Sequence, residues 1–117
     1  MREEIKNRWI ENLESGEYPK GVGSLRENGR YCCLGVLTDM YIREHDDLMW
    51  KGLLAVPKDA SDYCDEYTET LLPAKVREWA GIKDEDHRIH SFVGDSLASL
   101  NDCSETFEPV IERIKEL

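Results

Sequence analysis

The dipeptide Asn28-Gly29 is the sequence feature that most restricts how this chain can fold. Both residue types accept positive φ angles, and Asn-Gly is the strongest short-range signal for a tight turn between two antiparallel strands. The run from Gly21 to Leu25 precedes the turn, and the run from Arg30 to Cys33 follows it. The sequence therefore predicts a short antiparallel β-hairpin over residues 21–33.

Apolar residues recur at helical spacing in three other segments. They are Ile5, Trp9, Ile10 and Leu13, then Leu34, Leu37, Met40 and Tyr41 with Val36 beside them, and then Phe107, Val110, Ile111 and Ile114. A face of this kind is typical of an amphipathic helix that packs on a core. With its 117 residues, the chain has the usual size of one domain. We therefore predict a single α+β domain, residues 1–117, in which three main helices pack with a small antiparallel β-sheet, the 21–33 hairpin.

Serine, glycine and proline indicate where helices begin and end. Ser15-Gly16 is expected to end the first helix, and Gly81 to end a further helix that begins at Pro73. Ser104 is expected to cap the N-terminus of the last helix. Gly35 lies inside the second helix, where glycine costs about 1 kcal/mol relative to alanine. This glycine predicts either close packing against a neighbouring segment or a ligand near the first turn.

Other stretches carry weaker patterns. The apolar residues before Pro57 are expected to dock onto the core; they are Trp50, Leu53, Leu54 and Val56. Residues 58–71 are rich in acids and read as a long exposed loop. Ile89, Phe92 and Val93 are candidates for a short strand. Residues 96–100 are candidates for one helical turn, which Asn101-Asp102 would end.

Charge is distributed unevenly along the chain. There are 15 basic and 25 acidic side chains, a net charge of -10. Residues 18–43 hold four basic and two acidic side chains, a local net charge of +2, so the remainder sums to -12. The electrostatic field of the whole protein, which is negative, would repel a polyanion such as duplex DNA. A small anion responds mainly to the local cluster, because charges beyond about 10 Å are screened. The sequence therefore argues against a nucleic-acid polymer and favours a small anionic ligand.

Three features bear on compartment and on metals. No segment approaches the roughly 18 apolar residues of a membrane span, and the charged first residues predict that no signal peptide is present. We therefore expect a cytoplasmic protein with no membrane partner. Four cysteines are present, two of them adjacent at Cys32-Cys33, and none has the C-x-x-C spacing of a zinc site. We expect free thiols, no metal and no cofactor.

A set of motifs resembles a known group of proteins. They are Trp9, the run from Leu13 to Tyr18, Lys20-Gly21, Leu25, the YCCLGVL run from Tyr31 to Leu37, Asp39, Leu72-Pro73, Trp79, Leu100-Asn101-Asp102 and Phe107. In this set the chain is similar to small, mostly uncharacterised proteins of bacteriophages and prophages. The resemblance implies a phage-encoded protein that acts in the bacterial cytoplasm. It implies no catalytic residue.

The basic segment supplies the groups that a nucleotide-like ligand needs. Cationic side chains would bind anionic oxygens, and glycines would let the backbone approach the ligand. Aromatic rings would stack on a base, and an amide or carboxylate would read its polar edges. The candidate residues are Tyr18, Lys20, Gly21, Gly23, Arg26, Arg30, Tyr31, Trp50, Asn101 and Asp102. We expect a phage accessory protein of the anti-defence type that sequesters a signalling nucleotide without catalysis, as a monomer or homo-oligomer.

Two other function classes stay open. The first is a protein-interaction module that inhibits a host factor, in which the acidic surface and the 58–71 loop would suit a basic partner. The second is a small enzyme in which Cys33, activated by a helix N-terminus, is the nucleophile and His87 or His90 is the base. Against this enzyme stands the commoner outcome, in which a cysteine is simply buried as a small apolar side chain.

Overall fold

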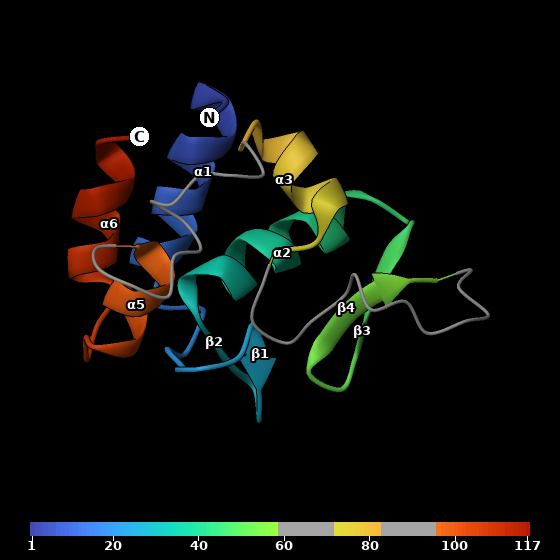
Figure 1. Ribbon diagram of the computed structural model, residues 1–117, viewed down its shortest axis with the longest axis horizontal. Coiled ribbons are helices and arrows are strands. Elements are labelled where there is room, and N and C mark those ends of the chain that lie inside the picture. The colour runs from blue at the N-terminus through green and yellow to red at the C-terminus, as the bar shows by residue number, and fades with distance from the viewer. Residues whose placement is uncertain (59–71, 83–95) are drawn as a thin grey trace.

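The computed structural model describes residues 1–58, 72–82 and 96–117 (Figure 1). The helices are α1 (Glu3–Glu14), α2 (Cys33–Glu44), α3 (Ala74–Ala80), α5 (Leu97–Asp102) and α6 (Glu108–Lys115). The strands are β1 (Arg26–Glu27), β2 (Arg30–Tyr31), β3 (Leu48–Lys51) and β4 (Leu54–Pro57). They form two separate antiparallel sheets of two strands each, β1 with β2 and β3 with β4.

The mixed α+β composition agrees with the prediction, but the predicted arrangement of three main helices on one sheet is wrong. The described residues form five helices and two sheets. Helices α3 and α5 have only seven and six residues, too few to show a clear period. The β3–β4 sheet is hidden because the apolar run Leu53–Val56 does not alternate with polar residues. Its signal is Gly52, which has a φ of 62° in the tight turn between these strands.

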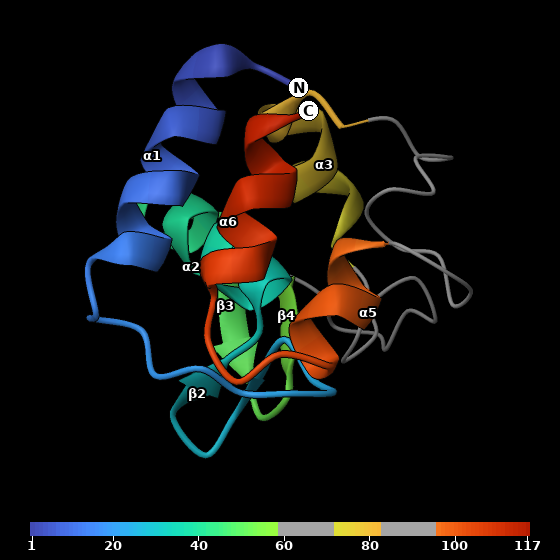
Figure 2. The same cartoon turned by 90° about the vertical axis from the view of Figure 1, so that its left-hand side faces the viewer.

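Helix α2 forms the centre of the core. Every residue from Cys33 to Tyr41 is buried, and α1, α3 and α5 all pack against this helix. Helices α1 and α6 lie side by side next to α2 (Figure 2). The helical spacings are confirmed, because the predicted positions are buried in each case: Ile5, Trp9, Ile10 and Leu13 on α1, Leu34 to Tyr41 on α2, and Phe107, Val110, Ile111 and Ile114 at α6.

Gly35 is explained by close packing. A Cβ atom built on Gly35 would lie 1.7 Å from the Leu25 carbonyl oxygen. This separation is far below van der Waals contact, so only glycine lets the loop before β1 reach the first turn of α2. Of the two alternatives for this glycine, the packing alternative is therefore the one that the structure supports.

Helix ends were predicted with mixed success. Ser15 and Gly81 are the C-cap residues of α1 and α3, as expected, whereas Pro73 is the N-cap of α3 and not its first residue. Ser104 does not cap α6, since its hydroxyl donates to the Leu100 carbonyl oxygen at 2.7 Å and the N-cap position is Phe107. Asn101-Asp102 do not end the preceding turn either, because they form the last residues of α5.

The β1–β2 hairpin is present with the predicted turn but is shorter than 21–33. Asn28 and Gly29 have φ angles of 53° and 76°, and the paired residues are only Arg26 with Tyr31 and Glu27 with Arg30. The segment before β1 bends away and returns to the other side of β2. There Lys20 forms a parallel bridge with Tyr31, and the Gly21 N–H donates to the Tyr31 carbonyl oxygen at 2.7 Å.

Some expectations lie outside the described residues. They concern the 58–71 loop beyond Lys58, the strand at Ile89, Phe92 and Val93, and the histidines His87 and His90. Within the described ranges, no helix has both the length and the apolar character needed to cross a membrane.

Candidate functional site

The hairpin brings three predicted site residues next to one another. Tyr31 on β2 pairs with Arg26 on one side and bridges to Lys20 on the other. Gly21 permits this second approach, because a Cβ atom at that position would lie 2.9 Å from the Arg30 Cβ. Lys20, Tyr31 and Arg26 therefore lie on adjacent segments.

A surface hollow lies at this hairpin. Its volume is about 310 Å³, and it is lined by Lys20, Gly21, Val22, Ser24, Glu27, Asn28 and Arg30. Arg30 reaches toward the opposite wall, where its Nη1 donates to the Lys20 carbonyl oxygen at 3.5 Å. The Ser24 hydroxyl donates to Glu27 at 3.4 Å. The hollow thus presents two cations and one carboxylate, together with the backbone of Gly21.

The three predicted aromatic residues form one continuous series. The rings of Tyr18 and Tyr31 meet edge-to-face with centroids 4.9 Å apart, and those of Tyr31 and Trp50 are 6.2 Å apart. The Arg26 guanidinium lies over the Trp50 ring, 5.3 Å from its centroid. Arg43 lies over Tyr18 at 5.5 Å. Two arginines therefore flank a row of aromatic rings. The row lies on the face of the hairpin that carries Tyr31 and Arg26, opposite the face of Glu27 and Arg30.

Asp39 anchors this series from inside the protein. Its side chain is buried and accepts hydrogen bonds from the Tyr18 hydroxyl at 2.7 Å and from the Trp50 indole N–H at 3.0 Å. It also pairs with Arg43 Nε at 2.8 Å. Burial and the bond to Asp39 raise the pKa of Tyr18 above its usual range. Tyr18 therefore stays a neutral donor, and Asp39 accepts bonds from three donors at once.

Asn101 and Asp102 make their hydrogen bonds within the chain. Asn101 is fully buried. Its side-chain oxygen accepts from the Cys33 N–H at 3.0 Å, and its side-chain amide N–H donates to the Gly21 carbonyl oxygen at 3.1 Å. The Asp102 carboxylate accepts from the Gly23 N–H at 2.9 Å. These bonds attach α5 to the loop before β1 and to the start of α2. Four predicted ligand-binding residues, Gly21, Gly23, Asn101 and Asp102, therefore fix the loop before the hairpin in place.

Sequence reasoning overlooked two members of the site, Asp39 and Arg43. Asp39 is the one charged residue on α2 before Arg43, so it stands out from the apolar pattern around it. A carboxylate at such a position needs partners, because a buried charge without hydrogen bonds is strongly destabilising. That signal indicates a polar cluster, but it does not identify Trp50 as a member.

Cys33 occupies the first residue of α2, as expected, but its thiol is not activated. Cys33 is fully buried, and burial holds its pKa well above the usual value. Burial also raises the pKa of Cys32 to about 11, and the Cys32 sulfur caps the helix by accepting from the Gly35 N–H. Both groups therefore remain thiols at neutral pH. Among the described residues, no cluster of His, Cys, Asp and Glu could hold a metal ion.

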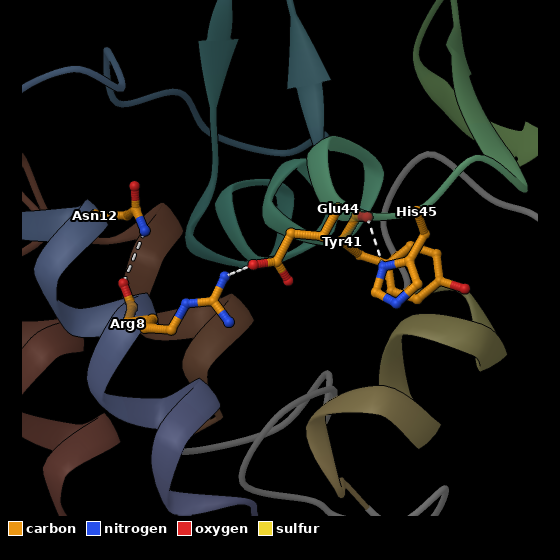
Figure 3. Close-up of polar contacts among 5 residues, drawn as sticks. All are labelled: Arg8, Asn12, Tyr41, Glu44 and His45. Atoms are coloured by element: carbon orange, nitrogen blue, oxygen red, sulfur yellow. Dashed lines mark hydrogen bonds and ion pairs between the residues drawn. The ribbon is translucent and has the colours of Figure 1, made fainter.

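Contacts at the C-terminal end of α2 join this helix to α1 and to α3, and Figure 3 draws those of Arg8, Tyr41, Glu44 and His45. Arg8 of α1 forms an ion pair with Glu44 of α2. The adjacent His45 ring stacks on Tyr41 with centroids 4.0 Å apart, and Trp79 of α3 meets both rings edge-on. These contacts fasten helices together at the end of α2 away from the hairpin.

Comparison with known proteins places the chain in a family without assigning it an activity. No curated protein and no solved structure matches the chain. A family model matches residues 1–117, over the whole length of the chain. The protein therefore belongs to the family described as Domain of unknown function (DUF8296).

Proposed function

We propose that this protein binds and sequesters a small anionic ligand at the β1–β2 hairpin, without catalysis. The observation that carries the proposal is the 310 Å³ hollow lined by Lys20 and Arg30, on a chain whose net charge is -10. Two cations against the one carboxylate of Glu27 leave a positive excess at one hollow of an acidic protein. This excess favours an anion small enough to respond to the local charge. The raised pKa values of Cys32 and Cys33 support binding over thiol catalysis.

The biological setting of this proposal comes from the resemblance. Phage and prophage proteins act in the bacterial cytoplasm, where an accessory protein of the anti-defence type would remove a nucleotide signal of immunity. A nucleotide has the anionic groups that Lys20 and Arg30 would bind. A homo-oligomer would multiply the number of sites per particle.

Native mass spectrometry and calorimetry with a panel of cyclic and linear nucleotides test the proposal. We expect added mass for at least one compound and a loss of affinity of roughly 10- to 100-fold in Arg30→Glu, the range for a charge-assisted hydrogen bond. Lys58→Glu makes the same charge change at an exposed lysine that does not line the hollow, so its affinity should stay near that of the wild type. Absence of binding to every compound would refute the proposal.

A basic protein partner is the second candidate, favoured by a different hollow. This hollow of about 490 Å³ lies where the end of α1 faces the start of α6. Its lining combines apolar side chains with four glutamates and two lysines, so that acidic groups are in excess: Leu13, Tyr18, Phe107 and Ile111, then Glu14, Glu105, Glu108 and Glu112, and Lys20 and Lys115. If this candidate is correct, Glu105→Lys with Glu108→Lys should abolish capture of the partner, and Arg30→Glu should not affect it.

A further inference from the structure

We propose that the ligand carries a planar ring, as a nucleobase does, and that this ring stacks on Trp50 in the place that the Arg26 guanidinium now occupies. The inference rests on the proposed function, since it extends the anion site from Lys20. It assigns ring stacking to one residue, Trp50, among the aromatic candidates. It also predicts that Arg26, once displaced from the indole, binds a phosphate of the same ligand.

The indole of Trp50 is held in place before any ligand arrives. Its N–H donates to Asp39 at 3.0 Å, and Asp39 is itself held by Tyr18 and Arg43. The Tyr31 ring packs edge-on against the indole. A platform ordered in this way loses little conformational freedom on binding, which favours affinity. Lys20 bridges to the other edge of Tyr31 through the backbone, so its side chain lies on the same face of the hairpin as Tyr31 and Arg26, whereas Glu27 and Arg30 lie on the opposite face. Lys20 is therefore the residue of the hollow that shares a face with the platform.

Trp50 is also accessible, which Tyr18 is not. Trp50 is half-buried, whereas Tyr18 is only 5 % exposed and its hydroxyl is bonded to Asp39. A flat ligand can therefore reach Trp50 but not the ring of Tyr18. Base–aromatic stacking accepts any nucleobase, because every base has a π face.

Arg26 can leave the indole without breaking an ion pair. Within the described parts of the chain, its guanidinium has no hydrogen bond or carboxylate partner, and its contact is the face of Trp50. A half-exposed cation–π contact of this kind is weak. A ring that displaced the guanidinium would free Arg26 to bind a phosphate of the same ligand, so one weak contact would be exchanged for two stronger ones.

Calorimetry with matched anions tests the ring separately from the anion. The probes are inorganic pyrophosphate, which has no ring, and adenosine and guanosine diphosphate, which add a nucleoside to the same anionic group. We expect the two nucleotides to bind roughly 5- to 150-fold more tightly than pyrophosphate, the range for stacking of one base. Trp50→Leu should reduce their affinity to that of pyrophosphate and leave pyrophosphate binding unchanged, which also shows that the variant folds.

Two further variants sharpen the test. Met49→Leu changes the preceding residue on β3, which is 42 % exposed and points to the other face of the strand, and should bind all probes as the wild type does. Trp50→Phe keeps an aromatic face but lacks the donor to Asp39, so it should lose part of the nucleotide preference. Equal affinity for all three probes, or a nucleotide preference that survives Trp50→Leu, would overturn the ring site while the anion site stands. Binding of none of the probes would overturn both.

Discussion

At the scale of single residues, several motif residues are joined by hydrogen bonds around Cys33. The Trp9 indole N–H donates to the Cys33 carbonyl oxygen at 2.9 Å. On the other side, the Asn101 side chain accepts from the Cys33 N–H and donates to the carbonyl oxygen of Gly21. All of these polar atoms lie at buried or half-buried positions, where loss of one partner costs about 1–3 kcal/mol. The motif therefore holds α1, α2, α5 and the hairpin together.

Gly35→Ala separates helix propensity from packing. Propensity alone predicts a gain of about 1 kcal/mol. Because the new Cβ would meet the Leu25 carbonyl oxygen, we expect instead that the free energy of unfolding in urea falls by roughly 3 kcal/mol, as for an overpacked core. An increase in stability would show that the loop before β1 can move away from α2 without loss.

Sequence analysis could place a side chain at the site only where a nearby sequence pattern, such as the Asn-Gly turn, indicates its position. Tyr31 and Arg26 flank the Asn-Gly turn, so their proximity follows from hairpin pairing. Asp39 was not predicted there because its bond to Trp50 joins α2 to β3, and such a bond leaves no periodic pattern. The internal roles of Asn101 and Asp102 were hidden for the same reason, since they contact a loop some 80 positions earlier in the chain.

At the scale of elements, Asp47 ties the start of the second sheet to two helices. Its carboxylate accepts from the Tyr41 hydroxyl of α2 at 2.8 Å and from the Lys75 ammonium of α3 at 2.9 Å. The bond from Lys75 lowers the pKa of Asp47 below the ordinary value of 3.8. A carboxyl whose pKa is lower in the folded state stabilises the protein above the unfolded pKa, and this stabilisation is lost as pH falls through the folded pKa.

This linkage predicts a pH-dependent effect of Asp47→Asn. At pH 7 the variant should be less stable than the wild type by about 0.5 kcal/mol, a small value because the pair is partly exposed to water. The difference should shrink below pH 4, as urea unfolding at a series of pH values would show. Asp46→Asn is the matched control on an exposed neighbour and should change little. A difference that is the same at pH 7 and pH 2.5 would contradict the linkage.

Elements could be predicted from sequence in proportion to their length. Helices α1 and α2 have 12 residues each, enough turns for the apolar spacing to identify the buried face. Strands of two to four residues show almost no alternation, so only turn chemistry reveals them. Asn28-Gly29 is such a signal and the β1–β2 hairpin was found, whereas the Gly52-Leu53 turn is weaker and the β3–β4 sheet was not.

At the scale of the whole molecule, two charge distributions act on an anionic ligand in opposite directions. The segment 18–43 carries a net charge of +2, and the rest of the chain carries -12. The Debye length is about 30 Å at 0.01 M salt and about 10 Å at 0.1 M. At low salt the ligand therefore responds to charges across the molecule, whose longest extent is 39 Å. At moderate salt it responds mainly to the side chains around the hollow.

The affinity for pyrophosphate should consequently pass through a maximum as salt is raised. From 0.01 to 0.1 M sodium chloride, screening removes the distant repulsion and binding should tighten. Toward 1 M, where the Debye length is about 3 Å, the attraction of Lys20 and Arg30 is screened as well and binding should weaken. Titration calorimetry at 0.01, 0.1 and 1 M salt measures this curve.

Charge variants show whether the local basic segment or the acidic remainder of the chain controls binding at each salt concentration. Lys58→Glu lowers the net charge by two at a residue that does not line the hollow, so it should weaken binding at 0.01 M salt and have little effect at 0.1 M. Arg30→Glu changes the hollow itself and should weaken binding at both. A wild-type affinity that only falls as salt rises would mean that the local cluster outweighs the acidic remainder at every distance. The net charge of -10 would then not limit access of anions to the hairpin.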